Sequence, residues 1–266
     1  MKYSIITVNY NNREGLRKTI ESVIHQTYRD FEYIVIDGGS TDGSSDVLQE
    51  YNEHITYWVS EKDKGIYNGM NKGIAKAMGD YLNFMNSGDC FYDENVLQRL
   101  TEKDLSQGII VGRDYHYNSK TQKGFATILP PRISMLTFFI QTLPHQSTFF
   151  KRELFNNCPY DENLRIVSDI KFYIQKLCIE GCSIELIDDI ICRREPDGIS
   201  RSYNERRITE HRSVIEQTLP VGAIKDYETL SLLDKTTLYR LLELIEAPKS
   251  RKWITYAVKL LNKLFK

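Results

Sequence analysis

Small and acidic polar residues follow three apolar segments of the sequence and could form a ligand site. These groups are Thr7, Asn9 and Tyr10, then residues 37–40, then residues 86–89. Asn, Asp, Gly and Ser also form ordinary turns, so any one group could be loop structure alone. Each group, however, follows a predicted strand, and open parallel sheets bind ligands beyond the carboxyl ends of their strands. Three such groups at one sheet edge favour a ligand site.

The chemistry of the ligand is limited by what the sequence lacks. No G-x-G-x-x-G loop follows the first predicted strand, and no G-x-x-x-x-G-K-[ST] loop occurs. A diphosphate bound without such a loop needs another source of positive charge, commonly a divalent cation held by a carboxylate. Asp89, just past the fourth predicted strand, is placed to hold that cation.

The elements that would position these groups alternate as in a parallel sheet. Short apolar runs separated by segments of helical apolar spacing are typical of βαβ units. The runs expected as strands are 4–8, 33–36, 55–59, 81–85, 109–112, 148–150 and 184–187. The segments expected as helices are 16–24, 44–51, 67–78, 169–179, 204–218, 226–245 and 250–265.

This order predicts an α/β fold with a mostly parallel central sheet and helices on both faces. The chain has 266 residues, at the upper end of what one core holds. No strand pattern occurs after about residue 204. We therefore expect an α/β domain over residues 1–203 and a helical C-terminal extension over residues 204–266.

Composition and charge exclude several classes of protein. The chain is 41% hydrophobic and 27% charged, the balance of an ordinary globular protein and not of a disordered or multi-span membrane protein. The net charge of −1 argues against a nucleic-acid partner, which would require a basic excess. The charge is unevenly distributed, because residues 249–266 contain six Lys or Arg and no acid.

Cysteine usage and the N-terminal sequence predict where the protein works. Five cysteines without a C-x-x-C motif read as reduced thiols of a cytosolic protein. Cys178 and Cys182 lie one helical turn apart but lack a second pair for zinc. The first apolar run meets Asn9 before a signal peptide is complete, and no stretch approaches a membrane span. The expected location is the cytoplasm or the inner face of the cell membrane.

Four motifs stand in a fixed order in the first ninety residues: 8–11 (VNYN), 35–43 (VIDGGSTDG), 60–73 (SEKDKGIYNGMNKG) and 79–89 (GDYLNFMNSGD). In order and spacing they resemble family 2 glycosyltransferases of the GT-A fold, of the bacterial surface-polysaccharide type, over roughly residues 3–200. The resemblance implies inverting transfer of a sugar from a nucleotide-diphosphate donor, most often UDP-linked, to an acceptor hydroxyl. A sugar nucleotidylyltransferase would need a Gly-rich basic N-terminal signature that is missing.

The resemblance assigns the nucleoside to the first two motifs. Thr7, Asn9 and Tyr10 would contact the nucleoside, with Tyr10 stacking on the base. Asp37 would accept a hydrogen bond from the uracil imide.

It assigns the rest of the donor to the third and fourth motifs. Asp63 and Lys64 would lie near the base and the ribose or phosphates, although they could instead be a solvated charge pair. Asn71 would support that loop from the following helix, and Ser87 would lie on the donor side.

The metal motif of the family is Asp-x-Asp, and here it is reduced to Ser87-Gly88-Asp89. The resemblance implies that Asp89 coordinates Mn²⁺ or Mg²⁺ through the donor diphosphate. One carboxylate plus phosphates and water is a reasonable ligand set for a hard cation. The reduced motif also leaves an alternative, a non-catalytic nucleotide-sugar binding module.

Inverting transfer needs a carboxylate that removes the acceptor proton, and the resemblance implies that Asp169 is this base. Ser168 replaces the commoner Glu before it. The same residues could instead cap the helix that follows, and both roles can hold at once.

Two later segments resemble parts of the family near the acceptor and the phosphates. His145 would lie near the donor sugar and acceptor, although a lone histidine can equally be structural. Arg193 and Arg194 precede a loop, residues 195–200, that could close over the diphosphate, with either arginine neutralising the leaving group. Asp197 replaces the first glycine of that loop in the family.

The C-terminal segment 252–266 has the pattern of an amphipathic helix. Trp253, Ile254 and Val258 share one face with leucines, and Lys252 and Lys259 lie on the other. Such a helix could lie in the plane of an anionic membrane, or it could pack against protein. A lipid-linked glycan acceptor would give a membrane helix a purpose.

Overall fold

The computed structural model describes residues 2–103, 105–195 and 204–264. It divides into two compact units, which are considered separately. The first contains residues 1–129 and 142–212, and the second contains residues 130–141 and 213–266. The boundary expected at residue 203 therefore differs from the division that the structure makes, because the helix after that point is shared and residues 130–141 join the second unit.

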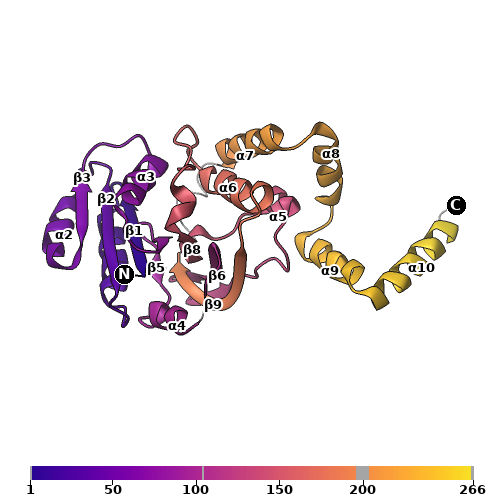
Figure 1. The fold of residues 1–266 in the computed structure, drawn as a ribbon, viewed down its shortest axis with the longest axis horizontal. Helices are drawn as coiled ribbons and strands as arrows, with labels where there is room; N and C mark the ends of the chain where they lie inside the picture. The colour runs from indigo at the N-terminus through magenta and orange to yellow at the C-terminus, as the bar shows by residue number, and fades with distance from the viewer. Residues whose placement is uncertain (1, 104, 196–203, 265–266) are drawn as a thin grey trace. The chain divides into compact units, whose positions relative to one another are not determined.

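The first unit is built on one curved mixed sheet (Figure 1). Its order is β3-β2-β1-β4-β8-β6-β9-β5, with β7 paired to β6. The four strands β3, β2, β1 and β4 are parallel, whereas β8 runs antiparallel to β4 and β6. The strands are β1 Tyr3–Asn9, β2 Phe31–Asp37, β3 Tyr57–Ser60, β4 Tyr81–Phe84, β5 Cys90–Phe91, β6 Ile109–Asn118, β7 Lys123–Ala126, β8 Thr148–Lys151 and β9 Ile184–Arg194.

Helices cover both faces of the parallel part, as predicted. Tyr3 and Ile5 of β1 belong to the buried cluster that contains Leu16 and Ile20 of α1. The alternate residues of β1 face α3, where glycines permit close contact. The helices of this unit are α1 Arg13–Ile24, α2 Ser44–Glu50, α3 Ile66–Lys76, α4 Val96–Glu102, α6 Ser168–Tyr173 and the first part of α7 Asn204–Thr218.

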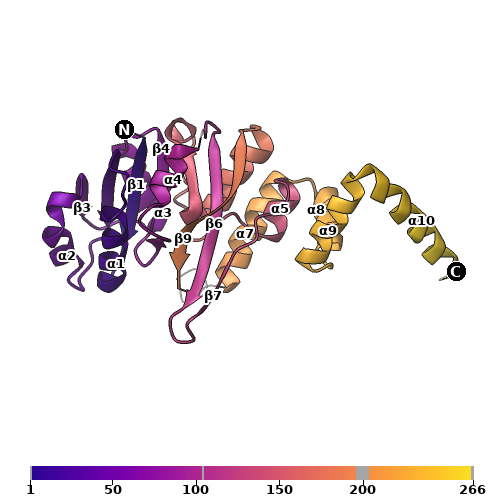
Figure 2. The same ribbon diagram turned by 90° about the horizontal axis from the view of Figure 1, so that it is seen from below.

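Three details of this unit differ from the expected elements. The strand expected at 109–112 continues to Asn118 and turns into a hairpin with β7, which Figure 2 shows from the side. The helix expected at 169–179 is α-helical only to Tyr173 and continues as a π-helix, Ile174–Ile179. A short 3₁₀ turn, His145–Ser147, precedes β8.

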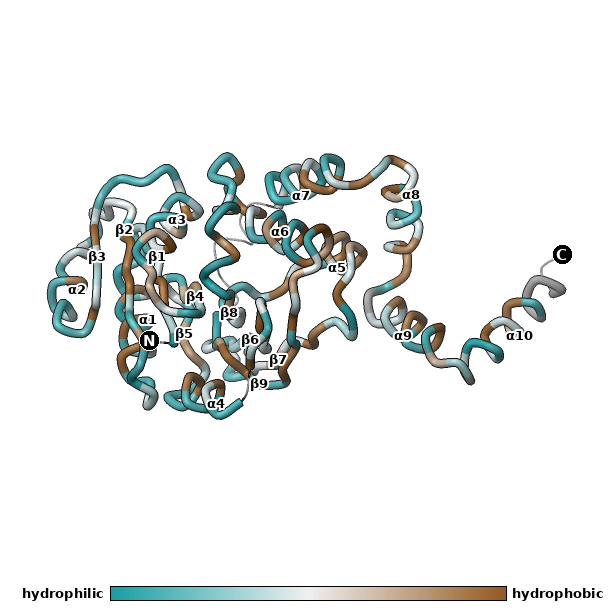
Figure 3. The backbone as a smooth tube through the Cα atoms, in the orientation of Figure 1, coloured by the Kyte–Doolittle hydropathy of each residue, from teal (hydrophilic) through white to brown (hydrophobic). Residues whose placement is uncertain are grey.

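The second unit is helical. It contains α5 Met135–Ile140, the end of α7, α8 Val221–Leu230, α9 Lys235–Glu246 and α10 Pro248–Leu264. The single helix expected at 226–245 is two helices, because Asp234 caps the N-terminus of α9 by accepting from the Thr237 N–H at 3.0 Å. Teal and brown turns mix along α10 in Figure 3, which agrees with its amphipathic sequence. None of the helices in the described residues has the length and apolar run needed to cross a bilayer.

Candidate functional site

Asp37, the last residue of β2, organises the turn that follows this strand. Its Oδ1 accepts from Asn9 Nδ2 at 2.7 Å, and its Oδ2 accepts from Ser60 Oγ at 2.6 Å. Ser40 donates through both its hydroxyl, at 2.6 Å to Oδ1, and its backbone N–H, at 2.9 Å to Oδ2. Burial alone would raise the pKa of Asp37, but these hydrogen bonds outweigh it and hold the pKa below its usual value. The predicted contact with uracil would require one of these hydroxyls to turn away.

Thr7, which was expected to contact the nucleoside, lies in the interior of the protein. The Thr7 side chain is fully buried, and its hydroxyl donates to the Met85 carbonyl at 2.7 Å and lies 3.0 Å from the Tyr33 hydroxyl. Asn9 is also buried, with its amide directed at Asp37. Both residues therefore support the strand ends from within the protein.

The side chains of Tyr10 and the half-buried Asp63 lie against Gly38, which is itself buried. Tyr10 is 62% exposed, so one face of its ring is open for stacking on a base. A Cβ on Gly38 would lie 2.7 Å from Asp63 Oδ2 and 3.2 Å from a Tyr10 ring carbon. A side chain at position 38 would therefore force Asp63 or Tyr10 to shift. The structure thus brings together Tyr10 and Asp63, which the sequence placed in separate motifs.

Asn71 has a different partner from the one expected. Its amide donates to the Tyr160 carbonyl and to Glu162 Oε1, both at 2.9 Å, and accepts from the Tyr160 N–H at 3.0 Å. The preceding loop is held by Asn68, whose side-chain oxygen accepts from the Lys64 N–H at 3.2 Å. The Lys64 side chain is exposed, as a phosphate contact or a solvated charge requires. Asn71 therefore ties α3 to the segment that precedes α6.

The turn of residues 86–89 is fixed by a threonine of α1. The Thr19 hydroxyl accepts from the Gly88 N–H at 2.9 Å and donates to the Asp89 carbonyl at 2.7 Å. Asn12 donates to the Ser87 carbonyl at 3.0 Å, so Ser87 faces the start of α1. Gly88 has φ +102°, a conformation that favours glycine. These contacts hold Asp89 at the edge of the sheet.

Asp89 is the residue of this edge that could hold a cation. Its Oδ2 accepts from Gln146 Nε2 at 3.1 Å. Burial raises the pKa of Asp89, although the charge of His145 and the bond from Gln146 oppose the rise. The described residues contain no group of three or more His, Cys, Asp or Glu side chains that could hold a metal. Asp89 therefore fits a hard cation only as a single protein ligand, with diphosphate oxygens and water completing the shell.

Asp169 lies in the first turn of α6 and is 8% exposed. Its Oδ1 accepts from the Tyr67 hydroxyl at 3.0 Å, and its Oδ2 lies 3.5 Å from His145 Nδ1. The other ring nitrogen of His145 lies 3.2 Å from Asn86 Nδ2, so His145 stands between Asp169 and the 86–89 turn. The N-cap of α6 is Val167, which makes no side-chain capping bond, so neither Ser168 nor Asp169 is the N-cap. The carboxylate keeps its second oxygen beside His145.

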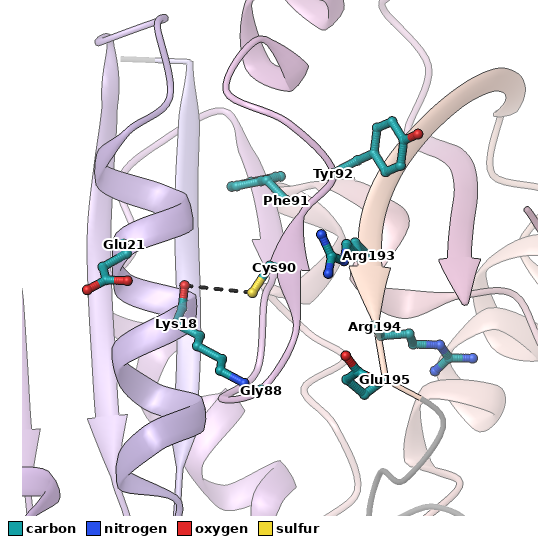
Figure 4. A pocket seen from close by; sticks show the side chains of 9 residues that line it. All are labelled: Lys18, Glu21, Gly88, Cys90, Phe91, Tyr92, Arg193, Arg194 and Glu195. Atoms are coloured by element: carbon teal, nitrogen blue, oxygen red, sulfur yellow. Dashed lines mark hydrogen bonds between the residues drawn. The ribbon is translucent and has the colours of Figure 1, made fainter. Parts of the chain in front are cut away.

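Arg193 and Arg194 end β9 beside a cavity of about 290 Å³ that Gly88 also lines (Figure 4). Figure 4 shows the two guanidinium groups on opposite sides of the strand. Arg193 stacks over the Tyr117 ring at 4.3 Å, and Arg194 Nε lies 3.1 Å from the buried carboxylate of Asp114. The predicted loop beyond Glu195, with Asp197, lies outside the described residues.

Four residues of the site were not assigned from the sequence: Thr19, Tyr67, Asp114 and Gln146. Thr19 and Tyr67 lie on the buried faces of α1 and α3, and Asp114 and Gln146 are buried polar residues of β6 and of the 3₁₀ turn His145–Ser147. A buried Thr between Leu16 and Ile20 on an apolar helix face, or a Tyr inside a helix rich in glycine, is compatible with ordinary packing. Their partners lie far away in the sequence, so spacing could not reveal them.

The chain is similar in sequence to known proteins. A family model described as Glycosyl transferase family 2 matches residues 4–165. An uncharacterised glycosyltransferase of Mycobacterium tuberculosis is 33% identical over 201 residues, covering 74% of this chain and 76% of the relative. A PGL/p-HBAD biosynthesis glycosyltransferase of Mycobacterium bovis is 27% identical over 184 residues, covering 65% and 68%.

Solved structures support the fold. Residues 1–349 of Staphylococcus aureus TarS, in complex with UDP-GlcNAc, match with a TM-score of 0.63 at 18% identity. The match covers 76% of this chain and 61% of that one. The mannosyltransferase PcManGT of Pyrobaculum calidifontis, in complex with GDP-Man and Mn²⁺, matches with a TM-score of 0.62 at 15% identity, covering 97% and 80%. At these identities the matches bear on the fold alone.

Proposed function

The chain belongs to glycosyl transferase family 2, and we propose that it is an inverting transferase that moves a sugar from a UDP-sugar to an acceptor hydroxyl. It is a glycosyltransferase with the GT-A fold, of the type that builds surface glycans. Relatives of the fold have been solved with UDP-GlcNAc and with GDP-Man, which supports a nucleotide-sugar donor.

The observation that carries the proposal is the position of Asp169. A buried carboxylate that makes an ion pair with a basic surface residue would be structural, but Asp169 instead faces His145, which contacts the 86–89 turn. His145 therefore lies between Asp169, the carboxylate expected to take the acceptor proton, and the 86–89 turn, which is expected to hold the donor diphosphate. This nearness supports inverting transfer, in which a base takes the acceptor proton while the acceptor oxygen attacks the anomeric carbon opposite the leaving diphosphate.

Each part of the site then has a role. Tyr10 stacks on the nucleobase, and Asp63 and Lys64 bind beside it, on a surface shaped by Asn9, Asp37 and Gly38.

Asp169 removes the acceptor proton. Asp89 would hold Mn²⁺ or Mg²⁺, and a bound cation stabilises negative charge on the leaving diphosphate. Arg193 and Arg194 would add positive charge beside the 86–89 turn, because both line the cavity that Gly88 also lines.

A donor screen tests this proposal against the alternative of a non-catalytic nucleotide-sugar binding module. The thermal unfolding midpoint is measured with UDP-, GDP- and dTDP-sugars, each with and without Mn²⁺, and nucleotide release is followed in the same mixtures. We expect stabilisation by a UDP-sugar that depends on Mn²⁺, with slow release of UDP. Stabilisation without any release of nucleotide, with acceptor glycans present, would favour the binding module.

We further propose that α10 rests on an anionic membrane at the cytoplasmic face, where a lipid-linked acceptor would be met. Trp253 is 74% exposed and Val258 is 49% exposed on this helix. The exposed Lys252 and Lys259 belong to a segment, 249–266, that has six basic residues and no acid. Packing against protein would explain the apolar residues, but it would not require every charge to be positive. An anionic surface explains both features.

A further inference from the structure

We propose that Tyr67 is a positioning residue for the base, holding Asp169 by one oxygen so that the other receives the acceptor proton. The proposal rests on the transfer reaction proposed above and adds a residue and an atom to it. Tyr67 lies at the start of α3, 102 positions from Asp169 in the sequence, and its hydroxyl donates to Asp169 Oδ1 at 3.0 Å. Both side chains are buried, so water does not compete for this bond.

The donor side of this bond is fixed by the way α3 is packed. A Cβ on Gly69 would lie 2.7 Å from a Val8 methyl, and one on Gly73 would lie 2.5 Å from an Ile6 methyl. The backbone of α3 therefore rests directly on β1, the strand that leads to the nucleoside surface. Through its hydrogen bond to Asp169, Tyr67 fixes the catalytic carboxylate relative to β1.

The acceptor side is fixed by the same helix. Asn68 Nδ2 donates to Glu162 Oε2 at 2.8 Å, and Asn71 donates to the same carboxylate at 2.9 Å. These bonds hold the segment before α6 against α3, a few residues from Asp169. The hydrogen bond of Tyr67 is thus made between two elements that are already tied together, and little conformational entropy is lost in forming it.

Tyr67 remains a donor under all working conditions. Burial raises the pKa of Tyr67 well above its usual value, and the negative charge of Asp169 raises it further. A neutral phenol can donate to Oδ1 but cannot take a proton from the acceptor. Asp169 Oδ2, which faces His145 at 3.5 Å, is left as the oxygen that accepts the proton.

The proton and electron changes follow from this assignment. The acceptor O–H bond breaks and its proton goes to Asp169 Oδ2. The acceptor oxygen forms a bond to the anomeric carbon, and the bond from that carbon to the diphosphate oxygen breaks, so the nucleoside diphosphate leaves with the electron pair. Tyr67 keeps its proton throughout.

The titratable groups that face Asp169 come from four parts of the first unit. They are Tyr67 from α3, His145 from the 3₁₀ turn, Tyr160 from the segment before α6, and Tyr173 from α6 itself. Of the three tyrosines, Tyr67 is the one whose hydroxyl bonds to Asp169; the Tyr173 hydroxyl bonds to Thr148. A hydrogen bond to a carboxylate favours its charged form. Loss of the Tyr67 hydroxyl should therefore favour the protonated carboxyl, which cannot act as a base.

The chain offers a matched control for the test. Tyr160 is 3% exposed and its ring lies 5.4 Å from that of Tyr67, but its hydroxyl has no hydrogen-bond partner in the described part of the chain. Tyr67→Phe and Tyr160→Phe remove the same atom from the same buried cluster. Only the first removal takes a bond from Asp169.

The experiment measures sugar transfer by the full-length protein from pH 4.5 to 9. For Tyr67→Phe we expect kcat about tenfold lower at neutral pH, an unchanged KM for the donor, and an acidic limb of the pH profile moved up by about one unit. Tyr160→Phe should keep the wild-type limb. The position of the limb does not depend on the amount of folded enzyme, so partial misfolding cannot imitate the shift.

A second variant covers the case in which Tyr67→Phe does not fold. Tyr67→3-fluorotyrosine keeps the ring and a hydroxyl that donates more strongly, so its acidic limb should stay at the wild-type pH or move below it. The proposal is overturned if Tyr67→Phe keeps the wild-type limb, if Tyr160→Phe moves it equally, or if the fluorinated variant moves it upward. Absence of transfer by the wild type with every donor would instead overturn the proposed function.

Discussion

Single carboxylates in this protein differ in what surrounds them. Asp37 accepts hydrogen bonds from its own turn and has a lowered pKa, whereas burial raises the pKa of Asp89, which is bonded by Gln146. Asp169 has one oxygen bonded and one beside a histidine. These surroundings suggest a different role for each carboxylate. Asp37 holds a loop, Asp89 is suited to a cation, and Asp169 is suited to a proton.

The role of Asp37 predicts how stability depends on pH. A carboxylate whose pKa is lowered by folding stabilises the protein above its unfolded pKa, about 3.9, and this contribution is lost as the pH falls through the folded pKa. We expect the urea midpoint of the wild type to fall below about pH 4. Asp37→Asn should be less stable at pH 7 and should show a smaller fall in acid.

The control for this prediction is Asp226→Asn, which changes an exposed carboxylate of α8. It should follow the wild type across the whole range. Equal acid sensitivity of Asp37→Asn and the wild type would show that the turn does not depend on the charge of Asp37.

At the scale of the element, α3 connects the two sides of the site. Its glycines rest on β1, while Tyr67, Asn68 and Asn71 bond to residues between 160 and 169. The sequence predicted this helix from its apolar spacing and placed its motif at the donor. The bonds from this helix to residues 160–169 could not be predicted, because they join segments about 90 to 100 residues apart.

Crowding between α3 and β1 predicts the effect of one added methyl group. Gly73→Ala would place a Cβ 2.5 Å from the Ile6 side chain, which must shift, so we expect a loss of about 1–3 kcal/mol in the free energy of unfolding. Gly222→Ala is the control, because a Cβ there meets nothing within 4 Å. It should be neutral or stabilise the protein by up to about 1 kcal/mol. Equal unfolding midpoints for the two variants would contradict the close packing of α3.

The predicted and observed elements differ in ways that show how far sequence patterns determine the fold. The buried parallel strands were predicted closely, since a short apolar run between helical segments has few other interpretations. The β6–β7 hairpin was missed because the continuous apolar run ends before Gly112 and β7 is only four residues long. The break between α8 and α9 was missed because Leu232 and Leu233 continue the apolar pattern across it.

At the scale of the whole molecule, the distribution of charge suggests where the reaction takes place. The chain is nearly neutral, but its C-terminal helix is basic and amphipathic, with Trp253 and Tyr256 exposed. An acceptor carried on a lipid would keep the enzyme at a membrane surface. The basic helix would then raise the local concentration of enzyme near its acceptor.

Charge reversal tests the membrane proposal in the full-length protein. Lys252→Glu with Lys259→Glu should greatly reduce sedimentation with vesicles that contain phosphatidylglycerol, and 0.5 M salt should do the same to the wild type. Lys120→Glu with Lys123→Glu makes the same change of charge in the β6–β7 hairpin and should bind like the wild type. If both double variants lost vesicle binding equally, the binding would depend on net charge alone, and α10 would have no specific role in it.

Asp169 is proposed to remove the acceptor proton at a site that binds the donor separately. The direct measurement compares transfer and UDP binding in the wild type, in Asp169→Asn, and in Asp161→Asn, whose carboxylate pairs with Lys171 nearby. Asp169→Asn should lose about 10²- to 10⁴-fold in kcat while binding UDP as the wild type does, and Asp161→Asn should retain transfer. Full transfer by Asp169→Asn would contradict the account.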